Sequence, residues 1–95
     1  MTVKLRRIKM DFGAAIKVLK DGGKVAREGW NGKGMWLCYM PPFTVDSPNE
    51  RTRSHGITEA FNCGGYIVMW TAQGVWQPGW LASQNDMLAE DWVVV

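Results

Sequence analysis

The stretch Pro78–Trp92, Pro-Gly-Trp-Leu-Ala-Ser-Gln-Asn-Asp-Met-Leu-Ala-Glu-Asp-Trp, is the one around which the chain is organised. Ser83 followed by Asp86 has the spacing of a capping box, which predicts the start of a short helix. The Asp86 carboxylate also suits the positive end of a helix dipole. We therefore expect a short helix close to the end of the chain.

The two Trp residues of this stretch allow two interpretations. Trp80 lies just before the predicted cap, where free N–H groups and a flat aromatic ring suit a phosphate or a nucleotide. In the alternative, Trp80 and Trp92 belong to the core and Ser83 only caps the helix, and the residue pattern alone favours this. Met87 and Leu88 lie about one turn from Trp92, so we expect these three side chains to share a buried face.

A longer helix is predicted upstream, over residues 11–21. Asp11 is a suitable N-cap, and the pair Gly22-Gly23 ends the helix. Apolar residues recur along one helical face at i, i+3, i+4 and i+7, namely Phe12, Ala15, Ile16 and Leu19.

Short apolar segments with high strand propensity occupy most of the remaining chain. We expect strands over residues 24–28, 35–40, 66–71, 75–77 and 91–95. The strand at 35–40 is apolar on both faces and should be central, and the strand at 91–95 should pair inside the sheet because a free apolar edge invites aggregation. Asn31-Gly32 indicates a tight turn. The predicted fold class is α+β: a small, mainly antiparallel sheet with one N-terminal helix packed on a face and a short C-terminal helix.

The middle of the chain, residues 41–65, has no clear period, and Pro, Ser, Asn, Arg and Gly dominate it. We expect an irregular, variable loop there with at most one helical turn around residues 57–61. Its cationic residues are either solvated or fold over an anionic ligand, with solvation preferred for the histidine; they are Arg51, Arg53 and His55.

Length and charge limit the function classes. A chain of 95 residues is one domain, expected over 10–95 behind a basic extension at 1–9. The net charge of +2 comes from four bases in that extension, since the remainder holds seven bases against nine acids. This argues against binding of duplex nucleic acid. The chain has no apolar run of membrane-spanning length, and its basic first residues contain no apolar stretch of signal length. We therefore expect a cytoplasmic protein that does not enter a membrane.

A catalytic set is missing from the pattern. His55 is the only histidine, and Cys38 and Cys63 have neither a metal-ligand spacing nor an activating neighbour. Asp86 and Glu90 are spaced i, i+4, but ordinary helix carboxylates explain them better than a metal does. We expect no enzyme, no cofactor and no metal.

Flat aromatic side chains beside hydrogen-bonding groups favour a nucleotide-like ligand instead. Six Trp are more than a core of this size hides easily. Three Trp can stack on a base, three polar residues can read its edge or a ribose, and a guanidinium and a carboxylate add charge. The candidate ligand-binding residues are Arg27, Trp30, Asn31, Trp36, Trp80, Ser83, Gln84 and Asp86.

Three segments, at 10–16, 29–37 and 80–92, resemble a small phage and prophage family that includes the second type of Thoeris anti-defence protein. They read MDFGAAI, GWNGKGMWL and WLASQNDMLAEDW. The resemblance implies a sponge that binds cyclic ADP-ribose isomers, and in some members cyclic oligonucleotides, without degrading them. It also implies a homo-oligomer, a tetramer, with ligand at subunit contacts inside the bacterial host cell.

Residues 1–9 precede the usual start of this family, and residues 41–65 belong to its variable middle, which can alter the ligand. Two other functions stay open. One is a protein-interaction module whose Trp residues form an interface. The other is a nucleotide-degrading enzyme, which the missing catalytic set disfavours.

Overall fold

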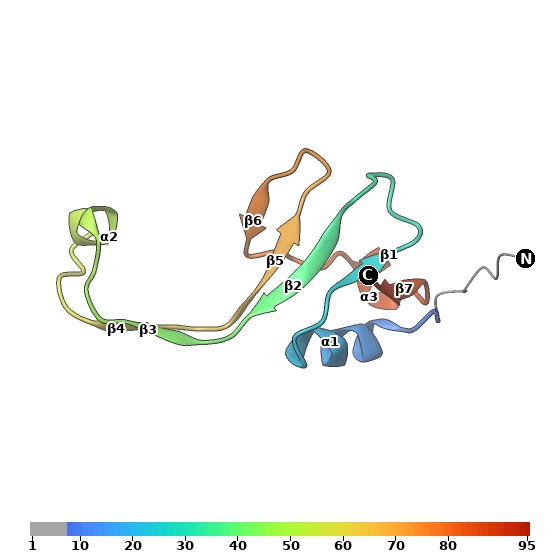
Figure 1. The fold of residues 1–95 in the computed structure, drawn as a ribbon, viewed down its shortest axis with the longest axis horizontal. Coiled ribbons are helices and arrows are strands. Elements are labelled where there is room, and N and C mark those ends of the chain that lie inside the picture. Colours follow the sequence, from blue (N-terminus) through green and yellow to red (C-terminus); the bar gives the residue numbers. More distant parts are fainter. Residues whose placement is uncertain (1–7) are drawn as a thin grey trace, which may run out of the picture.

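The computed structural model describes residues 8–95, and its body is a five-stranded antiparallel sheet in the order β6-β5-β2-β1-β7 (Figure 1). The basic extension expected at 1–9 lies outside the described residues except for its last two. The strands are β1 (Val25–Arg27), β2 (Trp36–Met40), β5 (Tyr66–Trp70), β6 (Trp76–Pro78) and β7 (Trp92–Val94).

Helix α1 (Phe12–Lys20) packs on one face of this sheet, as expected. It begins where the sequence predicts, because Asp11 accepts a hydrogen bond from the Ala14 N–H at 2.9 Å. It ends before Gly22, which has a positive φ of 95° that L side chains rarely adopt.

The core lies between α1 and the sheet. Its buried cluster is Ala15, Leu19, Val25, Leu37 and Trp92. The Trp92 ring centroid lies 5.5 Å from that of Phe12, 5.4 Å from that of Trp30 and 6.2 Å from that of Trp80. The indole N–H donates to the Asp86 carbonyl at 2.9 Å, so this large side chain is buried without an orphaned donor. Trp92 is thus a core residue, and the half-buried Trp80 packs against it.

The sheet confirms β2 as the central strand but places β7 at an edge, so the expectation that β7 lies inside the sheet was wrong. On its outer side β7 is covered by a single bridge. Met10 donates to the Trp92 carbonyl at 2.8 Å and accepts from the Trp92 N–H at 3.1 Å. This bridge, rather than another strand, protects part of the apolar edge.

The connection between β1 and β2 is a loop over residues 28–35 rather than a tight Asn31-Gly32 turn. The glycine with positive φ is Gly34, at 78°. A long connection is needed because β1 and β2 pair only at Val25 and Leu37, so the two strands are not paired where the loop leaves β1.

Residues 41–65, which we call the arm, are not irregular. Strands β3 (Phe43–Val45) and β4 (Phe61–Cys63) pair with each other, and helix α2 (Glu50–Ser54) lies at the tip. The expected helical turn at 57–61 was wrong. The helix lies earlier because Asn49 caps it, accepting from the Thr52 N–H at 3.0 Å; no residue of α2 is buried, so it has no apolar stripe to reveal it.

The arm projects from the body (Figure 1) and makes the molecule long. The principal extents are 59 × 32 × 26 Å and the radius of gyration is 16.8 Å, against about 12 Å for a compact chain of this length. The body and the arm therefore have different packing environments.

Helix α3 (Gln84–Leu88) has the predicted capping box. Ser83 Oγ accepts from the Asp86 N–H at 3.1 Å, and Asp86 Oδ2 accepts from the Ser83 N–H at 3.2 Å. The expected buried face was wrong, since Met87 is 46% and Leu88 79% exposed. The helix stops at Leu88 because Ala89 is extended, so Trp92 enters β7 instead of continuing the helical face. With these elements the α+β fold class is confirmed.

Candidate functional site

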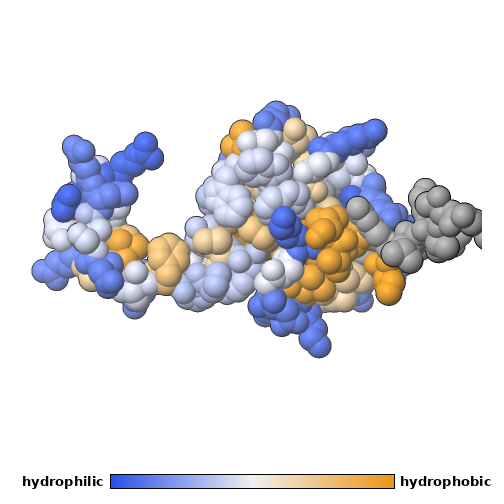
Figure 2. Space-filling view, in the orientation of Figure 1, coloured by the Kyte–Doolittle hydropathy of each residue, from blue (hydrophilic) through white to orange (hydrophobic). Residues whose placement is uncertain are grey.

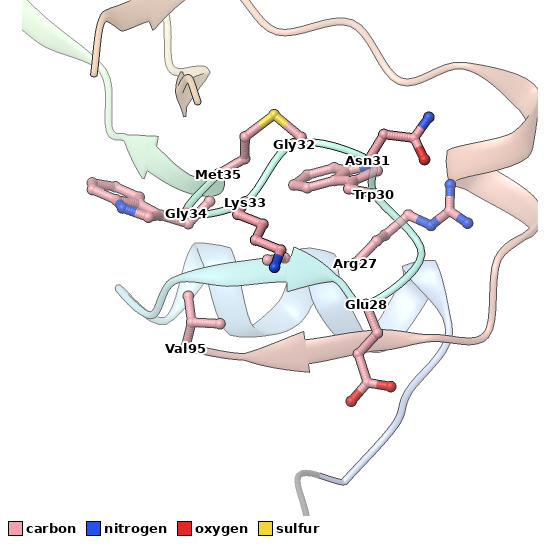
Figure 3. A pocket seen from close by; sticks show the side chains of 11 residues that line it. Arg27, Glu28, Trp30, Asn31, Gly32, Lys33, Gly34, Met35 and Val95 are labelled. Atoms are coloured by element: carbon pink, nitrogen blue, oxygen red, sulfur yellow. The ribbon is translucent and has the colours of Figure 1, made fainter. Parts of the chain in front are cut away.

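A pocket of about 430 Å³ lies under the 28–35 loop, at the end of β1 and the start of β2. Figure 3 shows the loop in front of the sheet and α1 behind it, so the pocket opens on the side away from α1. It is lined by Ala26, Arg27, Glu28, Trp30, Asn31, Gly32, Lys33, Gly34, Met35, Trp36 and Val95.

The free side-chain charge at this pocket is positive. The Lys33 side chain lies across the pocket (Figure 3), and no carboxylate of residues 8–95 forms an ion pair with it. Lys24 Nζ lies 4.4 Å from the centroid of the Trp36 ring at the pocket border, a cation–π contact. Glu28 points away and pairs with Lys9 at 3.4 Å. An anion that enters here meets Lys33 and the Trp36 ring, over which Lys24 lies.

Arg27 is the third cation at the pocket, but it is already paired. Its Nη1 donates to Asp86 Oδ1 and its Nε donates to Asp91 Oδ1, each at 2.9 Å. The side chains are only 18%, 13% and 25% exposed for Arg27, Asp86 and Asp91. The guanidinium therefore links β1 to the segment around α3, and its Nε and Nη1 donors are already used within the protein.

The pairing shifts the pKa of all three groups. The pKa of Arg27 is raised by its hydrogen bonds to Asp91 and then Asp86. Burial by itself would raise the pKa of Asp86, but hydrogen bonds from Trp30, Arg27 and Ser83 outweigh it and the pKa lies below its ordinary value. The pKa of Asp91 is lowered chiefly by the hydrogen bond from Arg27, against a smaller effect of burial. The network is thus charged at neutral pH.

Trp30 joins this network from the loop. Its indole N–H donates to Asp86 Oδ1 at 3.0 Å, and its ring meets Trp92 edge-on with centroids 5.4 Å apart. Gly29 donates its N–H to Asp91 Oδ2 at 2.7 Å. The start of the loop is therefore fastened to two carboxylates from the other end of the chain.

The structure brings half of the predicted ligand-binding residues to the pocket: Arg27, Trp30, Asn31 and Trp36. The other half does not line it. Trp80 packs on Phe12 and Trp30 with centroids 6.5 and 6.3 Å away. Ser83 and Asp86 cap α3, where they occupy the N–H groups that a phosphate would need, and Gln84 is exposed at the first position of that helix.

Sequence reasoning missed several lining residues, among them Lys33, Met35 and Val95. The position of Lys33, a single cation between Gly32 and Gly34, could have indicated from the sequence that it belongs to the site. No local signal marks Val95, because only the pairing of β7 with β1 brings the chain end there.

The cationic residues of the arm lie far from the pocket. Arg51 and Arg53 are exposed on α2, and His55 follows at its C-cap (Figure 1). Cys38 and Cys63 are both free. In the described part of the chain no group of three His, Cys, Asp or Glu residues is arranged to hold a metal ion. Residues 8–95 also contain no helix of the length and apolarity that a bilayer crossing requires.

Comparison with known proteins identifies relatives of this chain. Residues 10–95 match the family described as the Thoeris anti-defense 2-like domain. Thoeris anti-defense 2 of Bacillus phage SP01 is 39% identical over 89 residues, which cover 94% of this chain and 98% of the phage protein. The match spans the pocket, the Arg27 network and the arm alike. This chain therefore belongs to the Thoeris anti-defense 2-like family.

Proposed function

We propose that this protein is an anti-defense sponge that binds cyclic nucleotide immune signals, cyclic ADP-ribose isomers first among them, and holds them unaltered in the host cytoplasm. Family membership supports the anti-defense role. The observation that carries the binding mode is the pocket under the 28–35 loop, where Lys33 faces the cavity beside an aromatic wall.

The pocket suits the chemistry of such a ligand. A cyclic ADP-ribose combines an anionic pyrophosphate with a flat adenine and two riboses. Lys33 and Lys24 supply charge for the pyrophosphate, Trp36 and Trp30 supply aromatic surface for the base, and Asn31 supplies an amide for a hydroxyl. The volume of about 430 Å³ lies within the ordinary range of small-molecule sites.

The same lining supports binding without breakdown. Cleavage of a pyrophosphate or a glycosidic bond needs a positioned acid, base, nucleophile or metal. Among the lining side chains Glu28 is the single carboxylate, and it points outward to Lys9. Retention by charge and stacking needs none of these groups.

Self-association into a homo-oligomer, a tetramer with ligand at subunit contacts, belongs to the same proposal. An isolated two-stranded hairpin is marginally stable in water, yet the arm leaves Phe43 44% and Ile57 43% exposed. Trp76, 42% exposed, extends an aromatic row with Trp36 and Trp70. A second copy that covers these surfaces would bury them, and at Trp36 it would reach a residue that lines the pocket.

The binding proposal is tested by isothermal titration of the full chain with cyclic ADP-ribose isomers. Lys33→Met removes the free cation and Trp36→Ala removes the aromatic wall. We expect about 1–3 kcal/mol of affinity lost for the stacked ring. Lys20→Met on α1, an equal charge change away from the pocket, is the matched control and should bind like the parent.

Equal affinity of all three variants would place the site elsewhere. The exposed hydrophobic arm favours one other function, a protein-interaction module. That reading predicts no rise in melting temperature when the ligand is added, whereas the sponge predicts a rise that grows with ligand concentration.

A further inference from the structure

The loop that covers the pocket has few backbone bonds of its own. The last backbone hydrogen bond at the start of the loop is that of Trp30, whose N–H donates to the Arg27 carbonyl at 3.3 Å. Residues 31–34 form no backbone–backbone hydrogen bond with the described part of the chain. A glycine-rich segment also loses more conformational entropy on ordering than other sequences do. The shape of the loop therefore depends on contacts from outside it.

Two carboxylates supply those contacts to the first half of the loop. Asp91 accepts from the Gly29 N–H at 2.7 Å, and Asp86 accepts from the Trp30 indole at 3.0 Å. Hydrogen bonds to a charged acceptor are about twice as strong as neutral ones. A Cβ placed on Gly29 would come within 2.6 Å of Asp91 Oδ2, so this carboxylate lies directly against the loop backbone.

Arg27 makes the two carboxylates one unit. It bonds both of them at 2.9 Å, so neither can turn away without breaking an ion pair. The second half of the loop is held by packing instead. A Cβ on Gly32 would lie 2.9 Å from Met35 Cε and 3.1 Å from Ala72 Cβ, in the turn between β5 and β6.

We propose that Asp86 and Asp91 are positioning residues of the pocket, which hold Trp30 and Gly29 so that the loop keeps the shape that binds the ligand. Neither carboxylate lines the pocket, so each acts through the loop rather than on the ligand. This inference rests on the proposed function and deepens it, because it places determinants of affinity outside the cavity. It also connects α3 with the site, since Asp86 of its capping box is the acceptor for Trp30.

The direct test is the ¹⁵N–¹H spectrum of the full-length protein with Asp86→Asn, Asp91→Asn and the control Glu90→Gln. Glu90 is exposed, lies in the same segment and bonds to no part of the loop in residues 8–95. Trp30→Phe assigns the Trp30 indole signal. We expect that signal to move in Asp86→Asn and the Gly29 amide to move in Asp91→Asn. The Trp76 indole, on β6 at the opposite edge of the sheet from β7, should stay in place.

Affinity for cyclic ADP-ribose isomers is then measured on the same proteins. Each Asp→Asn variant should bind about tenfold more weakly, the equivalent of one charge-assisted hydrogen bond, while Glu90→Gln binds like the parent. Unmoved Trp30 and Gly29 signals would overturn the proposal, as would a displaced loop with unchanged affinity. If the parent binds none of these ligands, the proposed function fails separately, and the loop signals alone decide whether the carboxylates position the loop. Should Asp86→Asn not fold, Asp91→Asn and Trp30→Phe test the same contacts.

Discussion

The body and the arm of this molecule are held together by different means. The body buries Leu19, Leu37 and Trp92 between a helix and a sheet, and charged groups fasten its pocket loop. The arm has no such core. Its strands pair over three residues each, with one side-chain bond between Thr44 and Asn62 at 3.0 Å. Some of its apolar side chains, Phe43 among them, lie exposed at the surface (Figure 2). The body thus has a buried core of its own, whereas the arm leaves Phe43 and Ile57 exposed.

The sharpest test of the packing of the body is to remove its buried Trp and compare the loss with that of a more exposed Trp in the same sheet. Trp92→Ala should lower the free energy of unfolding by about 3–5 kcal/mol, because the ring is fully buried among three other aromatics. Trp76→Ala, at a 42% exposed site, should cost less than about 1 kcal/mol. Urea unfolding followed by circular dichroism measures both. Equal losses would erase the distinction between a packed body and an open surface.

A second test weakens the electrostatic link within the body. Asp91→Ala leaves Arg27 and Gly29 short of a partner, and we expect a loss of about 1–3 kcal/mol at pH 7. Chemical denaturation of parent and variant gives the value. A variant as stable as the parent would show that the link adds nothing to the body.

The pH dependence of that link follows from the sign of the shifts. Asp86 and Asp91 have lowered pKa values in the folded state, so their contribution is fully present above the unfolded value of about 3.9 and is lost as pH falls through the folded values. Between pH 4 and about pH 2 the parent should lose stability more steeply than Asp91→Asn. Parallel curves over that window would contradict the assignment.

The sequence predicted the body better than the arm, for physical reasons. Asp11 and Ser83 cap helices by local geometry, and the Phe12–Leu19 stripe repeats with the helical period, so these elements are visible in the sequence. The helix α2 is polar on every side and the strands of the arm are short, so neither periodicity nor composition reveals them. The apolar sequence of β7 suggested a strand inside the sheet, yet β7 lies at an edge. Its outer side is covered only by the bridge to Met10, a tertiary contact that the local sequence does not reveal.

The candidate site divides along the same line. Arg27, Trp30, Asn31 and Trp36 cluster because they lie on or beside one loop, which sequence proximity can show. Asp86 was singled out for its charge, but it reaches the loop through Trp30 and Arg27, a pairing across 56 and 59 residues that no local pattern encodes. Val95 enters the pocket through strand pairing alone.

The smallest expected effect on stability belongs to the arm. Phe43→Ser removes an exposed ring, and the free energy of unfolding of the body should change by no more than about 0.5 kcal/mol. Association should fall instead, which sedimentation velocity at micromolar concentration measures. A variant that assembles like the parent would mean that the arm is not part of the interface.

The most direct test of the central claim, that the ligand is held and not consumed, is to recover it after binding. The full-length protein is incubated for hours with an excess of a cyclic ADP-ribose isomer, denatured by heat, and the supernatant is separated by chromatography. Our account predicts that the intact cyclic species returns in full, and that native mass spectrometry before heating shows the same mass bound to the protein. Linear product in excess of one molecule per chain would contradict the account and identify an enzyme.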